Sequence, residues 1–290
     1  MARNCGTAIV LWILLAGGYG YFLRDRLPMP AMPIVAIVMA TFVWMGLIVI
    51  NGGRYALRDW HAQNRMARGE RPADGQLVAA IGPIRPTLGA LHSPLRGVEC
   101  VAYTYKIGPP AQTSDSPAPD YAGFAITRCA VHTSYGAMHI GTFALFEGVE
   151  KAVGDRAHAM AYVESTKFET LEGFKELATS MFAMYTAPAP MRRDWRVGGE
   201  PRLPVSSADL EESVIRVGET VTAYGRYVAA TNSIVSDIKD QGYLRITPGG
   251  EARRESSFPS NAIQKFIGGS VAIVASNALL WWVMRFIPLG

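Results

Sequence analysis

The residues best suited to chemistry are three cysteines and five histidines, and their spacing completes no site. Cys129 and His132 have the spacing of half a zinc site, but no second pair of ligands accompanies them, whereas a structural zinc ion takes four. His92 and His139 fall on or beside predicted strands, and nothing in the spacing requires them to approach His132. We therefore expect no catalytic residue, no metal site and no cofactor.

Motifs of the common enzyme classes are also missing from the sequence. There is no Walker phosphate-binding loop, no HExxH and no GxSxG, and no GxGxxG follows a strand. A membrane-bound hydrolase with an unrecognised site, built on His92, Cys129 and His132, stays open as an alternative. Cys100 and Cys129 would form one disulfide in an oxidising compartment and would be thiols on strands in the cytoplasm.

Two proline-rich segments are candidates for contact with a partner. Residues 187–204 are basic and surround one tryptophan, and residues 108–119 are rich in proline, serine and glycine. Such composition indicates irregular loops. The first segment is either a linker or an exposed interaction loop, and its candidate interaction residues are Arg192, Arg193, Trp195 and Arg196.

Three apolar runs without a charged residue lie toward the ends of the chain, at 5–23, 31–50 and 266–284. Each approaches the ~20 residues that an α-helix needs to cross the hydrocarbon core of a bilayer. We predict three transmembrane helices, the last over 263–287. The alternative for the first run is a cleaved signal peptide, although its basic start is weak and it has no small-residue cleavage site.

Polar and small residues within the last run indicate how it packs. Asn277 is its only strongly polar residue, and we expect it to hydrogen-bond to another helix. Gly268, Ala272 and Ser276 form a small-residue face. Such a face favours packing either against the first two helices or against a second copy of the chain.

The net charge of +4 and the pI near 9.0 do not indicate a nucleic-acid binder, because the excess charge lies outside the middle of the chain. Residues 70–260 hold 19 basic and 22 acidic residues, leaving 9 basic and 2 acidic residues elsewhere. Five arginines follow the second apolar run: Arg54, Arg58, Arg65, Arg68 and Arg71. By the positive-inside rule they place the middle domain in the cytoplasm, and they are candidates for contact with anionic lipid headgroups.

The middle of the chain has the pattern of a mainly β domain. Residues 51–73 indicate a basic juxtamembrane helix or a linker, and from Gly75 the hydrophobicity alternates with a period of two. We predict strands over 77–84, 98–107, 124–132, 138–146, 214–217, 221–227 and 244–246, with a hairpin around 134–136. Because these strands are short and sequential, the sheet should be mainly antiparallel.

Helices interrupt the strands at three places. Asp155 is placed to cap a helix that ends near Glu164. Residues 168–185 carry an apolar stripe at helical spacing, which indicates a helix packed on the sheet. Residues 206–212 begin with serines and are acidic, which favours a short helix.

Five short motifs follow one another through this domain: SPLRG at 93–97, ECVAYTYKI at 99–107, GEPRLP at 199–204, EESVIRVGETVTAYGRY at 211–227 and LRITP at 244–248. In their order and spacing, from about residue 75 to 285, the chain resembles the GIDE domain family, also called BAM ("beside a membrane"). The best known members are ubiquitin ligases of the mitochondrial outer membrane. In these the domain lies between two spans, faces the intermembrane space and is followed by a RING finger.

The resemblance implies a membrane-adjacent domain without ligase activity of its own. A RING finger needs about eight Cys and His ligands, and neither residue type occurs after residue 260. The chain is therefore similar to bacterial members that lack the RING. The mitochondrial topology, if it applied here, would oppose the cytoplasmic placement that the arginines indicate.

Together these patterns predict a membrane protein with three transmembrane helices and an α+β, mainly antiparallel β soluble domain. Its parts are a helix hairpin (1–50), the basic segment (51–73), a GIDE-like domain (74–260) and the third span (263–287). We expect a non-catalytic protein-interaction or scaffold module in a bacterial inner membrane. Its partners would be lipid and an unidentified protein, with a homo-oligomer through the helices as a further option. An E3 ubiquitin ligase-type component that relies on a partner for catalysis is the second hypothesis.

Overall fold

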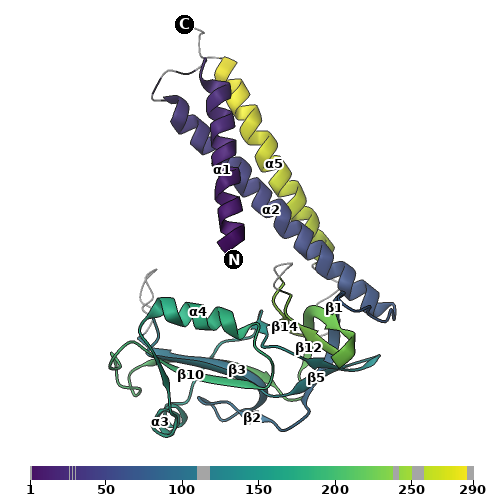
Figure 1. The fold of residues 1–290 in the computed structure, drawn as a ribbon, viewed down its shortest axis with the longest axis vertical. Helices are drawn as coiled ribbons and strands as arrows, with labels where there is room; N and C mark the ends of the chain where they lie inside the picture. Colours follow the sequence, from purple (N-terminus) through teal and green to yellow (C-terminus); the bar gives the residue numbers. More distant parts are fainter. Residues whose placement is uncertain are drawn as a thin grey trace. The chain divides into compact units, whose positions relative to one another are not determined.

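The computed structural model describes residues 2–25, 27, 29, 31–109, 118–237, 242–249 and 258–285. Contacts divide the chain into two units (Figure 1). One consists of Met1–Trp60 with Ser256–Gly290 and is here called the helical unit; the other, His61–Glu255, is called the mixed unit. Each is described by itself.

The helical unit is built from α1 (Ala2–Leu23), most of α2 (Ala31–Ala67) and α5 (Phe258–Arg285). Long runs of apolar residues form these helices, and their two prolines do not break them. Pro33 and Pro259 both lie in a first turn, where proline removes no helical hydrogen bond. The three helices lie side by side in Figure 1.

Small residues and two side-chain hydrogen bonds join the described parts of the helices. Trp12 Nε1 of α1 donates to Thr41 Oγ1 of α2 at 3.4 Å. A Cβ atom added to Gly269 of α5 would lie 2.7 Å from the carbonyl oxygen of Gly46 on α2, so only glycine permits this approach. The Tyr19 hydroxyl of α1 donates to Asn277 Oδ1 at 2.7 Å, which confirms the predicted interhelical bond. The contact with α2 runs through Gly269 and not through the predicted face, since a Cβ on Gly268 would meet no described atom within 4 Å.

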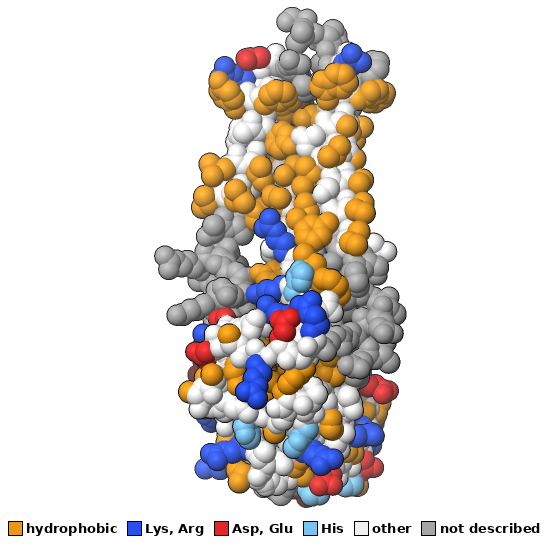
Figure 2. Space-filling model, turned by 90° about the vertical axis from the view of Figure 1, so that its right-hand side faces the viewer, with side chains coloured by type: hydrophobic (Ala, Val, Ile, Leu, Met, Phe, Trp, Pro, Cys, Tyr) orange, Lys and Arg blue, Asp and Glu red, His pale blue; other side chains and the backbone are white. Residues whose placement is uncertain are grey.

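Apolar side chains cover the outside of the helical unit, as Figure 2 shows for one face. Ile9 is 59% exposed, Ile34 61% and Val274 67%. Two helical stretches are long and apolar enough to cross a membrane, Ala31–Met66 and Ile263–Trp282, and Ile9–Leu23 is a shorter apolar helix. Of the three predicted spans, the structure therefore gives two of sufficient length and one shorter helix.

The mixed unit contains α-helices and two β-sheets. The first sheet has the strands β1 (Leu77–Pro86), β5 (Cys129–Thr133), β6 (Gly136–Ile140), β13 (Ser233–Val235), β12 (Thr220–Val228), β14 (Arg245–Pro248) and β7 (Leu145–Phe146), in that order. The second has the order β8 (Ala152–Val153), β11 (Asp209–Arg216), β3 (Glu99–Gly108), β4 (Tyr121–Ile126), β10 (Met191–Val197) and β9 (Glu169–Leu171), and β2 (Leu91–His92) pairs with β3. Among these strands the pairs β10–β9, β13–β6 and β14–β7 are parallel and the other pairs antiparallel.

The first sheet is barrel-like, because β1 pairs with both β12 and β5 and so closes the ring β1–β5–β6–β13–β12. β1 changes partner between Pro83 and Ile84, directly after Gly82, whose φ is +158°. A Cβ atom there would collide with the main-chain oxygen of His132. Alternate residues such as Val131, Val221 and Ile234 point inward and are fully buried.

The second sheet has a helix on each face (Figure 1). α4 (Phe174–Met184) packs on one face with Leu177 and Met184 buried. α3 (Arg156–Ser165) packs on the other face. Its N-cap is Asp155, which accepts a hydrogen bond from the main-chain nitrogen of His158, as predicted.

Three predicted elements are split by the tertiary structure. The strand predicted over 124–132 is wrong: β4 ends at Ile126 in one sheet and β5 begins at Cys129 in the other. The helix predicted over 168–185 begins only at Phe174. Its first part is β9, which pairs with β10. The strand predicted over 138–146 is two strands, because β6 ends at Ile140 and β7 begins at Leu145 with another partner. Local periodicity reveals none of these changes of partner.

Two further predictions fail because a strand replaces the expected element. The segment 187–204, predicted to be irregular, contains β10 over Met191–Val197. The acidic helix predicted over 206–212 is the start of β11. The hairpin around 134–136 is confirmed, since Thr133 of β5 faces Gly136 of β6.

Candidate functional site

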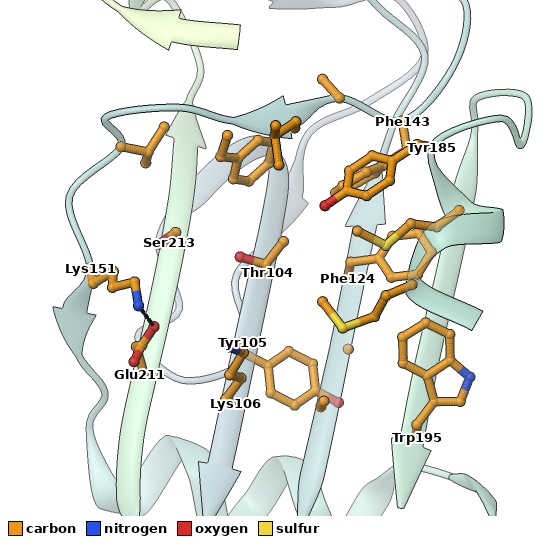
Figure 3. Close-up of a pocket in the computed structure, with 18 residues that line it drawn as sticks. Thr104, Tyr105, Lys106, Phe124, Phe143, Lys151, Tyr185, Trp195, Glu211 and Ser213 are labelled. Atoms are coloured by element: carbon orange, nitrogen blue, oxygen red, sulfur yellow. Dashed lines mark ion pairs between the residues drawn. The ribbon is translucent and has the colours of Figure 1, made fainter. Parts of the chain in front are cut away.

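A pocket of about 180 Å³ lies on the face of the second sheet that carries α4 (Figure 3). Its floor is formed by side chains of β11, β3, β4 and β10, which are neighbours in the sheet. Its walls come from α4 and from the chain around β7 and β8. It lies between a helix and a sheet and is a candidate binding site of the mixed unit.

Strand register arranges the floor in two rows across the sheet. One row consists of Ser213, Thr104 and Phe124. The other consists of Glu211, Lys106, Ala122 and Trp195. Both rows are polar on β11 and β3 and apolar on β4. On β10 the second row ends in Trp195, whereas the first row ends in Arg193, which does not line the pocket. The pocket therefore has a polar half and an apolar half. Ala122 has the smallest side chain of its row and leaves space between its neighbours.

The polar half contains two lysines, one glutamate and two hydroxyls. Lys151 Nζ lies 2.6 Å from Glu211 Oε1 (Figure 3), and Lys106 is the direct cross-strand neighbour of Glu211. The hydroxyls of Thr104 and Ser213 line the same pocket, and neither hydrogen-bonds to a described residue. This half therefore carries one excess positive charge and two hydroxyls open to a ligand.

The apolar half is a packed aromatic cluster with two methionines. The Phe124 ring centroid lies 4.6 Å from that of Phe143 and 5.4 Å from that of Trp195. Met181 and Met184 of α4 complete the wall. Methionine side chains adapt to differently shaped groups, so this half can accept a compact apolar group.

A polar network on the opposite face holds α3 against the sheet. Asp194 accepts hydrogen bonds from the hydroxyls of Tyr105 at 2.8 Å and Tyr162 at 2.5 Å, and Arg192 Nε lies 2.8 Å from it. Burial and the neighbouring carboxylate raise the pKa of Tyr162 to about 12. These hydroxyls therefore stay protonated as donors at neutral pH, and the network supports β3 and β10 from beneath the pocket.

A second buried polar cluster joins two of the sequence motifs. Glu212 is 1% exposed and accepts from Ser93 Oγ at 2.9 Å and from the Leu95 main-chain nitrogen at 2.8 Å. Ser93 Oγ in turn accepts from the Val98 nitrogen. Burial raises the pKa of Glu212 above its ordinary value. The carboxylate of Glu212 thus fixes the turn at 93–97 to β11.

The four predicted interaction residues lie on β10, but their side chains make separate contacts and form no common surface. Trp195 is 4% exposed in the core, so its prediction as part of an exposed loop is wrong. Arg192 pairs with Asp194, and the side chains of Arg193 and Arg196 are directed to Glu169 at 3.7 Å and to the Gly199 oxygen at 2.8 Å. Alternation along a strand sends Arg192 to the α3 face and Arg193 to the α4 face.

One edge of β10 has no strand beside it in the described part of the chain. β9 pairs only with Trp195–Val197. The Val197 main-chain nitrogen donates to the oxygen of Asp120, on the β4 side, and the Gly198 nitrogen donates to the oxygen of Leu171 in β9. By alternation the main-chain groups of Arg192 point to the side away from β4, and no described strand meets them there.

The basic segment after residue 50 is a continuation of α2 and not a separate helix, since α2 runs to Ala67. Arg54 is exposed. The guanidinium of Arg58 lies 5.2 Å from the ring centre of Tyr55. The predicted basic segment over 51–73 is therefore helical as far as Ala67, but it is not an independent element.

The remaining basic residues of that segment make local contacts. Arg65 Nη2 donates to the Leu77 oxygen at 3.1 Å, where β1 begins. Arg68 Nε lies 2.9 Å from Glu70 Oε1, and Arg71 is exposed. Contact with lipid headgroups stays a prediction for these arginines.

The candidate thiol and imidazole groups are kept apart by the fold. Cys100 and Cys129 are free, buried and on different sheets, and burial raises the pKa of each thiol to about 12. Cys129 points into the barrel, whereas His132 and His139 are exposed on its outside and His92 lies on the second sheet. No three His, Cys, Asp or Glu side chains among the described residues form a metal cluster.

Of the residues that line the pocket, only Trp195 was a candidate interaction residue in the sequence, and it was expected on an exposed loop. Their only sequence signal is the paired alternation of Thr104 and Lys106 on one strand with Glu211 and Ser213 on another, and this becomes a site only once the register is known. The predicted loop at 108–119 lies outside the described residues over 110–117. No family model, no curated protein and no solved structure matches the chain.

Proposed function

We propose that this chain is an integral membrane protein whose helices anchor a non-catalytic interaction module. The observation that carries this proposal is the apolar outside of the helical unit, with Ile9, Ile34 and Val274 each more than half exposed. Exposed apolar patches beyond a few hundred Å² are rare on soluble monomers, whereas a bilayer accepts such a surface. All three helices cross the membrane in this proposal, including the shorter α1.

The mixed unit is the interaction module. Its support is the open edge of β10, where Arg192 presents main-chain groups and both Arg192 and Arg193 have side chains more than half exposed. An exposed strand edge binds an extended peptide by adding a strand to the sheet. The partner is a protein segment, and the motif resemblance makes a GIDE-like domain of a RING-less bacterial type our proposal for this unit.

The domain faces the cytoplasm in this proposal, because the basic residues cluster after the second apolar run and Arg54 and Arg71 are exposed. No catalytic step is proposed. The thiol of Cys129 is buried and its pKa is raised to about 12, so it supplies no thiolate to a hydrolase at neutral pH.

Membrane insertion and topology are tested in one strain. The full chain should stay in the membrane pellet after alkaline carbonate extraction. Ser134→Cys, exposed in the β5–β6 turn, is then placed in a variant with the three native cysteines replaced. Labelling by an impermeant maleimide only after cell lysis supports the cytoplasmic placement. Labelling of intact cells would reverse it, and release by carbonate would overturn the anchor.

The interaction role is tested with a photo-crosslinking amino acid at position 193. Discrete crosslinked proteins are expected from the full chain in cells. Arg192→Pro should remove them, because it deletes a main-chain donor on the open edge without touching the bonds to β4. Arg192→Gln is the matched control, which loses the charge but keeps the donor. Equal crosslinking in all three proteins would contradict strand addition.

A further inference from the structure

We propose that the pocket between α4 and the second sheet binds a small monocarboxylic acid that carries one compact apolar group, such as a phenyl or a branched alkyl group. The inference deepens the proposed function, since it rests on the mixed unit being a binding module. The pocket lies on the α4 face and is distinct from the β10 edge.

The size of the pocket limits the apolar group. Its volume is about 180 Å³, and an engineered apolar cavity of about 150 Å³ in another protein binds benzene. The pocket therefore holds one group of phenyl size and has no room for a long acyl chain. Its apolar wall of Phe124, Trp195 and two methionines supplies the contact surface.

The charges select an anion. Glu211 is the single carboxylate of this half; it pairs with Lys151 and lies opposite Lys106 in the register, so a ligand with one negative charge makes this half neutral. The Lys151–Glu211 pair has side chains 65% and 40% exposed, and such surface pairs contribute little, so Lys151 can turn to a ligand at small cost. The free hydroxyls of Thr104 and Ser213 can donate to the same carboxylate.

The register sets the distance between the two ends of the ligand. Lys106 is on β3 and Trp195 on β10, two strands away, and neighbouring strands lie about 4.8 Å apart. A carboxylate joined to its apolar group by two or three carbons spans this gap. A quaternary ammonium ligand is disfavoured, because the aromatic rings pack on one another and the polar end is positive.

The binding test uses the full chain in lipid nanodiscs and the probe 3-phenylpropionate. Isothermal titration should detect this acid, while 3-phenylpropanamide and 3-phenylpropylamine, which match its shape without the negative charge, should bind about tenfold more weakly or not at all. Equal binding of acid and amide would overturn the proposal, as would no binding of the acid at concentrations of about 5 mM.

Variants locate the site. The double variant Lys106→Gln, Lys151→Gln should bind the acid with about tenfold lower affinity, and Ala122→Leu should block the pocket. Lys167→Gln, an exposed lysine outside the pocket, is the matched control and should bind as wild type. Unchanged affinity in the lysine double variant would contradict the proposal even if Ala122→Leu failed to fold.

The experiment separates this inference from the proposed function. A peptide ending in a free C-terminal phenylalanine shares the same chemistry, and tighter binding of that peptide than of the acid would replace the small acid by a polypeptide end. Membrane retention and crosslinking at position 193 do not depend on the pocket. If they succeed while the acid fails to bind, only this inference falls.

Discussion

The two units of this protein use apolar residues in opposite ways. In the helical unit Ile9 and Val274 are 59% and 67% exposed. In the mixed unit Phe124 and Val131 are 1% and 0% exposed. Removing apolar surface from water stabilises a fold by roughly 25 cal/mol per Å². The mixed unit gains this stabilisation because its apolar side chains are buried, whereas the exposed apolar side chains of the helical unit are suited to an apolar surrounding.

The two units also differ in what fixes their geometry. The described helices approach through glycines and two interhelical hydrogen bonds, from Tyr19 to Asn277 and from Trp12 to Thr41. In the bilayer that we propose, lipid as apolar as leucine leaves no hydrophobic drive between them. The mixed unit interlocks large side chains and buried polar networks. Changes of the same type should therefore have different effects in the two units.

The largest expected effect is the loss of a core aromatic from the mixed unit. Trp195→Ala should destabilise the folded unit by about 3–5 kcal/mol, because a cavity replaces a buried ring. Pulse proteolysis of the full chain in urea measures the change. Phe182→Ala on α4, where the ring is 48% exposed, is the control and should change stability by less than about 1 kcal/mol. Similar losses of stability in both variants would show that the burial of the ring does not determine its contribution to stability.

A glycine contact should dominate the helical unit. Gly269→Val places side-chain atoms against Gly46 and Ile50 and should cost about 1–3 kcal/mol by overpacking. Unfolding in an SDS titration, followed by energy transfer between labels on α2 and α5, reports the loss. Gly268→Val makes the same change one position away, where space is open. This variant should unfold at the same SDS concentration as the wild type.

The pH dependence of the mixed unit should reveal Glu212. Its pKa is raised by burial, so its contribution to stability is complete below the unfolded pKa and is lost as pH rises through the folded pKa. As pH falls through that window, wild type should gain stability relative to Glu212→Gln. The urea midpoint against pH measures the difference between the two proteins.

A variant of opposite sign serves as the control for that titration. The pKa of Asp155 is lowered by hydrogen bonds from the main chain and side chain of His158. Wild type should therefore lose stability relative to Asp155→Asn as pH falls through the folded pKa. Differences of the same sign for both variants would refute the assigned directions.

The smallest expected effect is the single hydrogen bond between α1 and α5. Tyr19→Phe should destabilise the helical unit by about 0.6 kcal/mol, the usual value for such bonds between membrane helices. Asn277→Leu and the double variant complete a cycle in the same SDS titration. A coupling energy near zero would mean that the bond between the Tyr19 hydroxyl and Asn277 does not hold these helices.

Strong local patterns were enough to predict much of the fold. Period-two alternation located β1, β3 and β12, and Asp155 marked the start of α3. Asn277 was expected to bond to another helix because a polar amide in an apolar run needs a partner. These features depend on neighbours in the sequence or on the character of one side chain.

The candidate site depends on contacts that are distant in the sequence. Trp195 sits among arginines and prolines, and only the pairing of β10 with β4 makes it a core residue. Lys106 and Glu211 are remote along the chain, and the register of β3 with β11 sets them opposite each other. No local pattern shows which face of a strand a partner will cover.

The sequence by itself determined the division of this protein into apolar helices and a β-rich middle, because long apolar runs and alternating segments differ in composition and period. Only the tertiary structure decided that β1 closes the barrel by changing partner after Pro83, that β4 and β5 belong to different sheets, and that the pocket forms. Each of these follows from main-chain hydrogen bonds between distant segments. Those bonds are the same for every residue type, so the side chains do not encode them one by one.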